Sequence, residues 1–258
     1  AAHIQKIIQY ERVHKIKDMN ELKRRLGEDR RFFSYFHPAL EDEPIIFVQV
    51  ALTNGLGKSI QEIMKPSTEG GKKYDTATFY SISNCQEGLS RVTLGNFLIK
   101  RVVYEIQEEL PNIKNFGTLS PIPGFRDWFI TLDEKIIQNI LEKIPYNNIS
   151  FLKSKDLRVG DGRIASNKQA IIKLVAHYLM NEKNKKGLPI NDVCRFHLGN
   201  GAIIDDIVIN ANVSDVGFKR SFGVMVNYLY QLKNIEKNHE DYINNKKIII
   251  SNSLKKNI

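Results

Sequence analysis

A nearly unbroken apolar run from Ile45 to Leu52 constrains the fold more than any other feature of this sequence, because only Gln49 interrupts it. The run is far shorter than the roughly 18–20 residues needed to span a bilayer. It is typical of a β-strand that is covered on both faces, so it predicts a sheet with a buried centre. Residues 76–83, rich in Thr, Phe and Tyr, predict a second strand.

A strong helical stripe follows the second predicted strand, and Pro111 ends it. Its apolar residues are Phe97, Leu98, Val102, Ile106 and Leu110. The pattern elsewhere predicts helices over 19–26, 59–64, 133–143 and 166–183, strands over 115–119, 203–210 and 223–231, and a polar helical tail. This mixture predicts an α+β or α/β fold with a central twisted mixed sheet flanked by helices.

The first 28 residues are polar and helix-like, with Asp18 as the expected N-cap of the helix over 19–26. We interpret residues 1–28 as a helical lead-in that approaches a domain without forming its core, and residues 29–258 as the main domain. No internal repeat and no Pro- or Gly-rich linker divides the chain further.

The composition is that of an ordinary globular protein, with 42% hydrophobic and 26% charged residues and a net charge of +9. Much of the Lys lies in an Asn- and Ile-rich tail, so the charge is weak evidence for a nucleic-acid partner. Cys85 and Cys194 lack metal-ligand spacing and cannot form a disulfide scaffold, and no two histidines have metal-ligand spacing. The residues predict no metal site, no membrane span and a cytoplasmic protein, with an organellar matrix as the alternative if a leader was removed.

Three segments could carry chemistry. The turn at 88–95 leads into a helix start, where backbone N–H groups can bind a phosphate, although the residues by themselves favour an ordinary strand–helix connection. Ser120 precedes the stiff loop Pro121–Gly124, which holds it at the end of a strand or simply makes a rigid turn. His197 lies between apolar residues, before a predicted tight turn at Gly199–Gly201, and is either a site residue or a core histidine.

These segments, in this order, resemble the malonyl-CoA decarboxylase family in collinear blocks from about residue 11 to about 242. The most specific blocks are Leu119–Phe125 (Leu-Ser-Pro-Ile-Pro-Gly-Phe) and Arg195–Ala202 (Arg-Phe-His-Leu-Gly-Asn-Gly-Ala). The others are Leu22–Leu26, Phe36–Leu40, Val50–Thr53, Phe79–Asn84, Gly95–Val103 and Met225–Tyr230. The resemblance implies a GNAT-like acyl-CoA N-acyltransferase fold. It also implies a preceding helical oligomerisation domain, most of which is missing here.

The resemblance further implies the site. The family's CoA-binding turn falls on Ser90, Arg91, Val92, Thr93, Leu94, Gly95 and Asn96, its catalytic serine on Ser120 and its catalytic histidine on His197. Arg91 stands where many members have Gly, and it either crowds the pyrophosphate or adds a cation to it. Asn227 and Tyr230 are further candidate pocket residues, because the fold is expected to bring their strand near the site.

The implied reaction converts malonyl-CoA to acetyl-CoA and CO2 through an enolate. His197 is expected to protonate the enolate carbon, since imidazole changes charge near neutral pH, while Ser120 orients the carboxylate or accepts a proton. The thioester is itself the electron sink, so no cofactor is expected. The expected partners are malonyl-CoA and acetyl-CoA, without nucleic acid or membrane, and a homo-oligomer if the helical domain is present.

Two other functions remain open at this point. A CoA-dependent acyltransferase of the same fold would use the same CoA turn. A non-catalytic module that binds CoA or nucleic acid would use the positive charge, and its affinity for polyanions would depend on salt.

Overall fold

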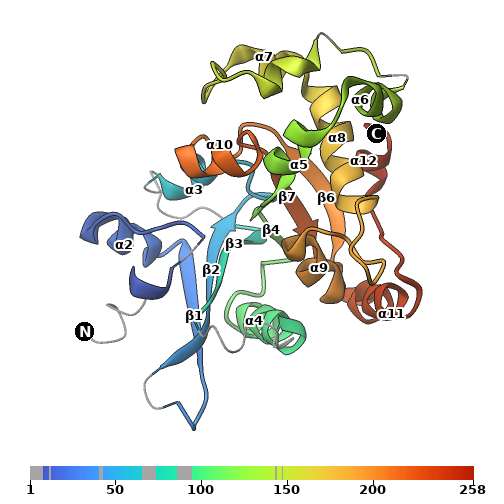
Figure 1. Ribbon diagram of the computed structural model, residues 1–258. Helices are drawn as coiled ribbons and strands as arrows, with labels where there is room; N and C mark the ends of the chain where they lie inside the picture. Colours follow the sequence, from blue (N-terminus) through green and yellow to red (C-terminus); the bar gives the residue numbers. More distant parts are fainter. Residues whose placement is uncertain are drawn as a thin grey trace. The chain divides into compact units, whose positions relative to one another are not determined.

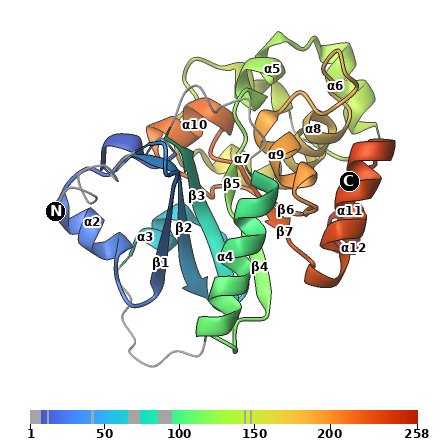
Figure 2. The ribbon, with the colours of Figure 1, turned by 90° about the horizontal axis from the view of Figure 1, so that it is seen from below.

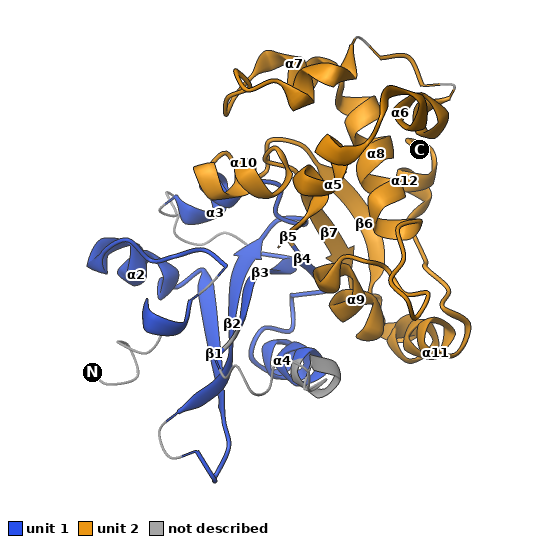
Figure 3. Ribbon diagram, in the orientation of Figure 1, with its two compact units in different colours: residues 1–118 blue, residues 119–258 orange. Residues whose placement is uncertain are grey.

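The apolar run predicted as a strand forms β2 (Pro44–Thr53), in which every residue from Ile46 to Leu52 is buried. A computed structural model of the chain describes residues 8–11, 13–40, 43–65, 74–85, 95–142, 144–146 and 148–258. Packing divides the chain into two units, residues 1–118 and 119–258 (Figure 3). The sequence predicted a different boundary, between residues 28 and 29, where a lead-in from a preceding helical domain would end. The division by packing does not test that boundary, so it stays a prediction.

The sheet of the first unit has the order β1–β2–β3–β4, with β1–β2 and β2–β3 antiparallel and β3–β4 parallel. Its strands besides β2 are β1 (Arg30–Phe36), β3 (Thr76–Asn84) and β4 (Asn115–Thr118). Helix α4 (Gly95–Glu109) connects β3 to β4 and lies on one face of the sheet, whereas α2 (Met19–Arg25) and α3 (Ile60–Met64) lie on the other (Figures 1 and 2). Helices on both faces explain why β2 is apolar throughout.

The lead-in is part of the core of the first unit, so the expectation that it lies outside the core is wrong. Leu22 of α2 packs with Phe47 and Cys85, and Tyr10 and Ile16 lie against the same cluster. Asp18 caps α2 as predicted, accepting a hydrogen bond from the backbone N–H of Glu21.

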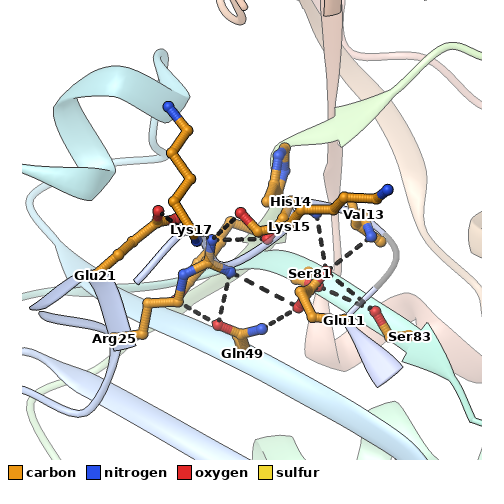
Figure 4. Close-up of polar contacts among 11 residues, drawn as sticks. Glu11, Val13, His14, Lys15, Lys17, Glu21, Arg25, Gln49, Ser81 and Ser83 are labelled. Atoms are coloured by element: carbon orange, nitrogen blue, oxygen red, sulfur yellow. Dashed lines mark hydrogen bonds and ion pairs between the residues drawn. The ribbon is translucent and has the colours of Figure 1, made fainter. Parts of the chain in front are cut away.

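A polar cluster also joins the lead-in to the sheet (Figure 4). The Glu11 side chain is fully buried and accepts hydrogen bonds from Ser81 and Ser83 of β3, from Gln49 of β2, and from two backbone N–H groups, those of Val13 and His14. The Arg25 guanidinium lies 3.8 Å from the Glu11 carboxylate and also bonds Glu21 and the His14 carbonyl. We call the Glu11, Arg25, Gln49, Ser81 and Ser83 side chains the Glu11 cluster.

In the second unit, β7 (Met225–Leu229) pairs antiparallel with β5 (Ser120–Pro121) and with β6 (Ile203–Val208). The tail adds a short parallel bridge, Ile204 to Ile250, to the free edge of β6. The helices are α5 (Phe125–Thr131), α6 (Glu134–Leu141), α7 (Gly162–Ser166), α8 (Lys168–Met180), α9 (Asp192–Gly199), α10 (Asp215–Ser221), α11 (Ile235–Asn245) and α12 (Asn252–Lys255), with short 3-10 turns η2 (Ile149–Lys153) and η3 (Leu232–Asn234).

All the predicted helices and strands are present with shifted ends, but the sequence missed the strands β1 and β5 and the helices α5, α7, α9 and α10. Residues 30–36 of β1 begin with two arginines and lack a clear alternation, and they become a strand by pairing along β2. His197 lies in the last turn of helix α9, and the tight turn expected after it is present at Asn200–Gly201, before β6. Within the described ranges, no helix has the length and apolarity to cross a membrane.

Candidate functional site

Strand β7 of the second unit gathers aromatic and hydroxyl side chains on one face. Ser120 is paired in register with Val226, and side chains on one strand alternate between faces, so Ser120 shares its face with Val226, Tyr228 and Tyr230. His197 of α9 meets this face. Its Nε2 lies 3.0 Å from Ser120 Oγ and its Nδ1 lies 2.8 Å from the Tyr230 hydroxyl, while Tyr228 stacks on its ring with centroids 4.5 Å apart.

The loop after Ser120 is fixed by its own prolines and by two neighbouring side chains, those of Tyr178 and Asn191. Pro121 and Pro123 restrict the backbone, and the Pro123 carbonyl accepts hydrogen bonds from Tyr178 Oη at 3.1 Å and Asn191 Nδ2 at 2.8 Å. Gly124 then turns with φ 81°, where a Cβ atom would lie 2.7 Å from the Tyr178 hydroxyl. Ser120 is therefore attached to a loop with little freedom to move.

The helix that carries His197 is fixed at both ends. Asn191 is its N-cap, and its side-chain oxygen accepts a hydrogen bond of 2.8 Å from the backbone N–H of Cys194. The same side chain donates to the Pro123 carbonyl, so Asn191 joins α9 to the Ser120 loop. At the other end Gly201 has φ 79°, and a Cβ there would overlap the backbone carbonyl of Ile235 at the start of α11.

Burial determines the charge of the site. It lowers the pKa of His197 to about 3, so the imidazole is neutral at neutral pH and carries a single N–H. Burial also raises the pKa of Tyr230 well above its ordinary value of 10, so this hydroxyl keeps its proton. The expectation that His197 titrates near neutral pH is therefore wrong for the ligand-free site.

Hydroxyl groups are the partners of both ring nitrogens, and a hydroxyl can donate or accept. The site can therefore hold either tautomer of the neutral imidazole, and it can also hold the imidazolium, without leaving a ring nitrogen unsatisfied. Arg195, two residues before His197, directs its guanidinium to the carbonyls of Pro189 and Ile190. The arrangement is thus a buried, uncharged donor–acceptor chain of Ser120, His197 and Tyr230.

The structure brings together three of the residues proposed from the sequence, namely Ser120, His197 and Tyr230. Asn227 is fully buried, and strand alternation places it on the other face of β7. Ser90, Arg91, Val92, Thr93 and Leu94 of the expected CoA turn lie outside the described residues. Gly95 and Asn96 are the first two residues of α4.

Sequence reasoning missed three residues that support the site: Tyr228, Asn191 and Tyr178. Tyr228 could have been found from its position two residues before Tyr230 on one predicted strand, because such residues share a face. Asn191 before Asp192 is a usable N-cap signal for α9. Tyr178 carried no signal, since its contact with Pro123 joins residues that are 55 positions apart. In the described part of the chain, no group of three or more His, Cys, Asp or Glu could hold a metal ion.

Comparison with known proteins identifies the family of this chain. The model of the malonyl-CoA decarboxylase C-terminal domain matches residues 1–258. The chain belongs to the malonyl-CoA decarboxylase family. It is 38% identical over 273 residues to the mitochondrial malonyl-CoA decarboxylase of Anser anser anser, covering 95% of this chain and 53% of that protein.

Solved structures agree with this family assignment. The crystal structure of malonyl-CoA decarboxylase from Rhodopseudomonas palustris has a TM-score of 0.83 and 40% identity, covering 98% of this chain and 62% of that one. Since the match covers 53% of the Anser anser anser protein, this chain spans about half the length of that relative. A GNAT-like decarboxylase, GphF in complex with isobutyryl-CoA, has a TM-score of 0.55 and 14% identity, covering 89% of this chain and 94% of its own. This likeness concerns the fold alone, and it confirms the GNAT-like fold expected from the sequence.

Proposed function

We propose that this chain decarboxylates malonyl-CoA to acetyl-CoA and CO2 at Ser120, His197 and Tyr230. The observation that carries the proposal is the buried contact of 3.0 Å between Ser120 Oγ and the neutral imidazole Nε2 of His197. Membership of the malonyl-CoA decarboxylase family supports the choice of substrate. The relatives' names give the reaction of those proteins, and the site geometry suits the same reaction here.

The reaction needs a donor that orients a carboxylate without opposing its loss of charge. When the C–C bond breaks, its electron pair moves into the thioester and CO2 leaves, so negative charge moves from the carboxylate to the enolate oxygen. A cation held against the carboxylate would stabilise the starting state and slow this step. A neutral hydroxyl such as that of Ser120 orients the group at a smaller electrostatic cost.

The proton for C2 comes from His197 in this proposal. Ser120 separates the substrate carboxylate from the imidazole, and the negative charge beyond it still favours the charged form of the buried ring, so substrate binding raises the pKa of His197 and the ring takes up one proton from solvent. Both N–H groups of the imidazolium then donate, to Ser120 Oγ and to the Tyr230 hydroxyl, which leaves the Ser120 proton directed toward the substrate. After CO2 departs, the Ser120 hydroxyl proton passes to C2 while the Nε2 proton replaces it on Ser120 Oγ, and the neutral imidazole returns.

Other parts of the proposal rest on the family resemblance. Residues 90–96 would bind the CoA pyrophosphate through backbone N–H groups, and Asn227, on the other face of β7, would support the strand that carries the pocket without contacting the substrate. The reaction would need no metal or organic cofactor, because the thioester accepts the electrons. We further propose that the protein forms a homo-oligomer when a helical domain precedes this chain, and that it has no nucleic-acid or membrane partner. We also propose a cytoplasmic location, although the Anser anser anser relative is a mitochondrial enzyme by name.

The first test is to mix the purified chain with malonyl-CoA and to follow the release of acetyl-CoA and CO2. His197→Asn removes the proton donor and should lower kcat by about 100- to 10,000-fold. Ser120→Ala should lower kcat more than it raises KM. The matched control is His177→Asn, because His177 lies half-buried in α8 against Trp128 and Glu182, outside the site, and its replacement should leave kcat unchanged.

Each outcome has a defined meaning. Turnover that persists in His197→Asn would contradict the assigned proton donor. No turnover by the unmutated chain, with CoA thioesters still bound, would contradict the decarboxylase proposal. Transfer of the acyl group to an added amine would then identify an acyltransferase, and binding without either reaction would identify a non-catalytic module.

A further inference from the structure

Tyr228 contacts the site without reaching either nitrogen of the catalytic histidine. Its ring stacks on the imidazole of His197 with an interplanar angle of 26°, and it is almost completely buried. Tyr230, two residues along the chain, binds Nδ1 from the edge of the ring. The two tyrosines therefore contact His197 in different ways, Tyr230 at one atom and Tyr228 over the ring face.

The hydroxyl of Tyr228 is held by a chain of hydrogen bonds that leads away from the site. It bonds the thiol of Cys194, which lies one helical turn before His197 in α9. The Cys194 thiol in turn donates to the Leu179 carbonyl at 3.8 Å. Leu179 lies in the last turn of α8, where backbone carbonyls have no partner within the helix. Since the thiol donates to this carbonyl, its sulfur accepts from the tyrosine.

We infer that Tyr228 and Cys194 are positioning residues for His197: the stacked ring sets the plane of the imidazole, and the thiol holds the stacked ring in place. This inference rests on the proposed function, because it concerns the same proton donor. The hydrogen bond to Tyr230 restrains one atom of the imidazole and does not by itself fix the tilt of the ring plane. Stacking fixes that tilt and keeps Nε2 directed at Ser120 Oγ.

A double-mutant cycle tests whether the hydroxyl and the thiol act through each other. Tyr228→Phe keeps the stacked ring and Cys194→Ala keeps the helix, and each removes one hydrogen bond, so each should lower kcat by at most about tenfold with KM unchanged. The double variant Tyr228→Phe/Cys194→Ala should lose no more than either single variant. Cys194→Ser retains a donor and an acceptor and should keep the native kcat. Multiplied losses in the double variant would overturn the inference.

A second measurement does not depend on turnover. Tyr228→Leu removes the stack, and the ¹⁵N signals of the His197 ring should shift or broaden because the ring gains freedom. In the active chain, kcat should fall by about 100-fold, the cost expected when a reacting group is displaced by about 1 Å. Unchanged His197 signals in a folded Tyr228→Leu variant would overturn the inference, and this holds even if the chain proves not to be a decarboxylase.

Tyr242→Phe is the matched control. Tyr242 is buried in α11, and its hydroxyl has no hydrogen-bond partner among the described residues. Removal of this hydroxyl should leave both kcat and the His197 signals unchanged. An equal loss in Tyr242→Phe and Tyr228→Phe would show that any missing hydroxyl near α9 has this effect, and it would overturn the specific role of Tyr228.

Discussion

Each unit of the molecule buries a cluster of polar side chains, and the two clusters differ in charge. The Glu11 cluster pairs a buried carboxylate with a buried guanidinium and surrounds both with donors and acceptors (Figure 4). The site of the second unit contains two hydroxyls and an imidazole that burial keeps neutral. Both clusters are buried, so burial alone does not distinguish a structural cluster from a reactive one.

The two clusters also differ in what their hydrogen-bond partners allow. Glu11 receives donors from β2, β3 and the lead-in and faces the Arg25 guanidinium, so several partners at once fix the position of its carboxylate. His197 has a hydroxyl on each nitrogen, so either protonation state can be accommodated. The first cluster holds one arrangement, whereas the second can gain and release a proton without rearranging. We use this comparison to order three predictions by the size of the expected effect.

At neutral pH the largest effect is expected from Glu11→Ala. The variant removes the Glu11 carboxylate from the buried Arg25 guanidinium, although Glu21 still pairs with Arg25. The free energy of unfolding should fall by about 3 kcal/mol, near the lower end of the range for broken buried ion pairs. Urea denaturation measures the loss. Glu108→Gln, an exposed change on α4, is the control and should stay within about 0.5 kcal/mol of the unmutated chain. A loss for Glu11→Ala no larger than that of the control would show that the cluster does not stabilise the unit.

The second effect is a dependence of stability on pH that comes from His197. In the unfolded chain its pKa is about 6.5, and in the folded chain burial lowers it to about 3. Between these two values the unfolded chain binds the extra proton, so stability is fully present above pH 6.5 and falls as the pH drops toward 3. The slope is at most about 1.4 kcal/mol per pH unit.

The pH prediction is measured as a difference between two chains. We would measure the free energy of unfolding of the unmutated chain and of His197→Asn by urea denaturation. The pH values would lie between about 4 and 7, roughly the range of the predicted slope. The difference between the two chains at each pH removes the contribution of all other groups. The unmutated chain should lose stability faster as the pH falls. Parallel curves would mean that His197 binds protons equally in both states, and they would contradict the neutral site in our comparison.

The smallest effect concerns Asn191, which caps α9 and donates to the Pro123 carbonyl. Asn191→Ala loses both contacts and should cost about 1 kcal/mol of stability. Asn191→Ser keeps an oxygen that can cap α9, so the free energy of unfolding should be nearly unchanged. The shorter serine side chain does not reach the Pro123 carbonyl as a donor, so kcat should fall. The comparison of these two variants separates the cap from the connection to the Ser120 loop. Native kcat in Asn191→Ser would show that this connection does not position Ser120.

The sequence predicted the elements whose pattern is local. The run of β2 and the stripe of α4 repeat with the periods of a strand and a helix, and Asp18 is a capping residue at the start of α2. Strand β1 lacked such a pattern, because its residues depend on pairing with β2. The lead-in was interpreted wrongly for a related reason: Glu11 is polar, and only its partners on β2 and β3 explain why it is buried.

The same division holds for the site. Ser120 and His197 were predicted from residue blocks that resemble a family, and Tyr230 from its place on a strand. The sequence could not show that these side chains meet, because 77 positions separate Ser120 from His197 and only the pairing of β5 with β7 and the packing of α9 bring them within 3.0 Å. It also could not show the charge of the imidazole, since desolvation is a property of the folded surroundings. Local periodicity and side-chain chemistry are thus written in the sequence, whereas burial, and with it the pKa of His197, exists only in the tertiary structure.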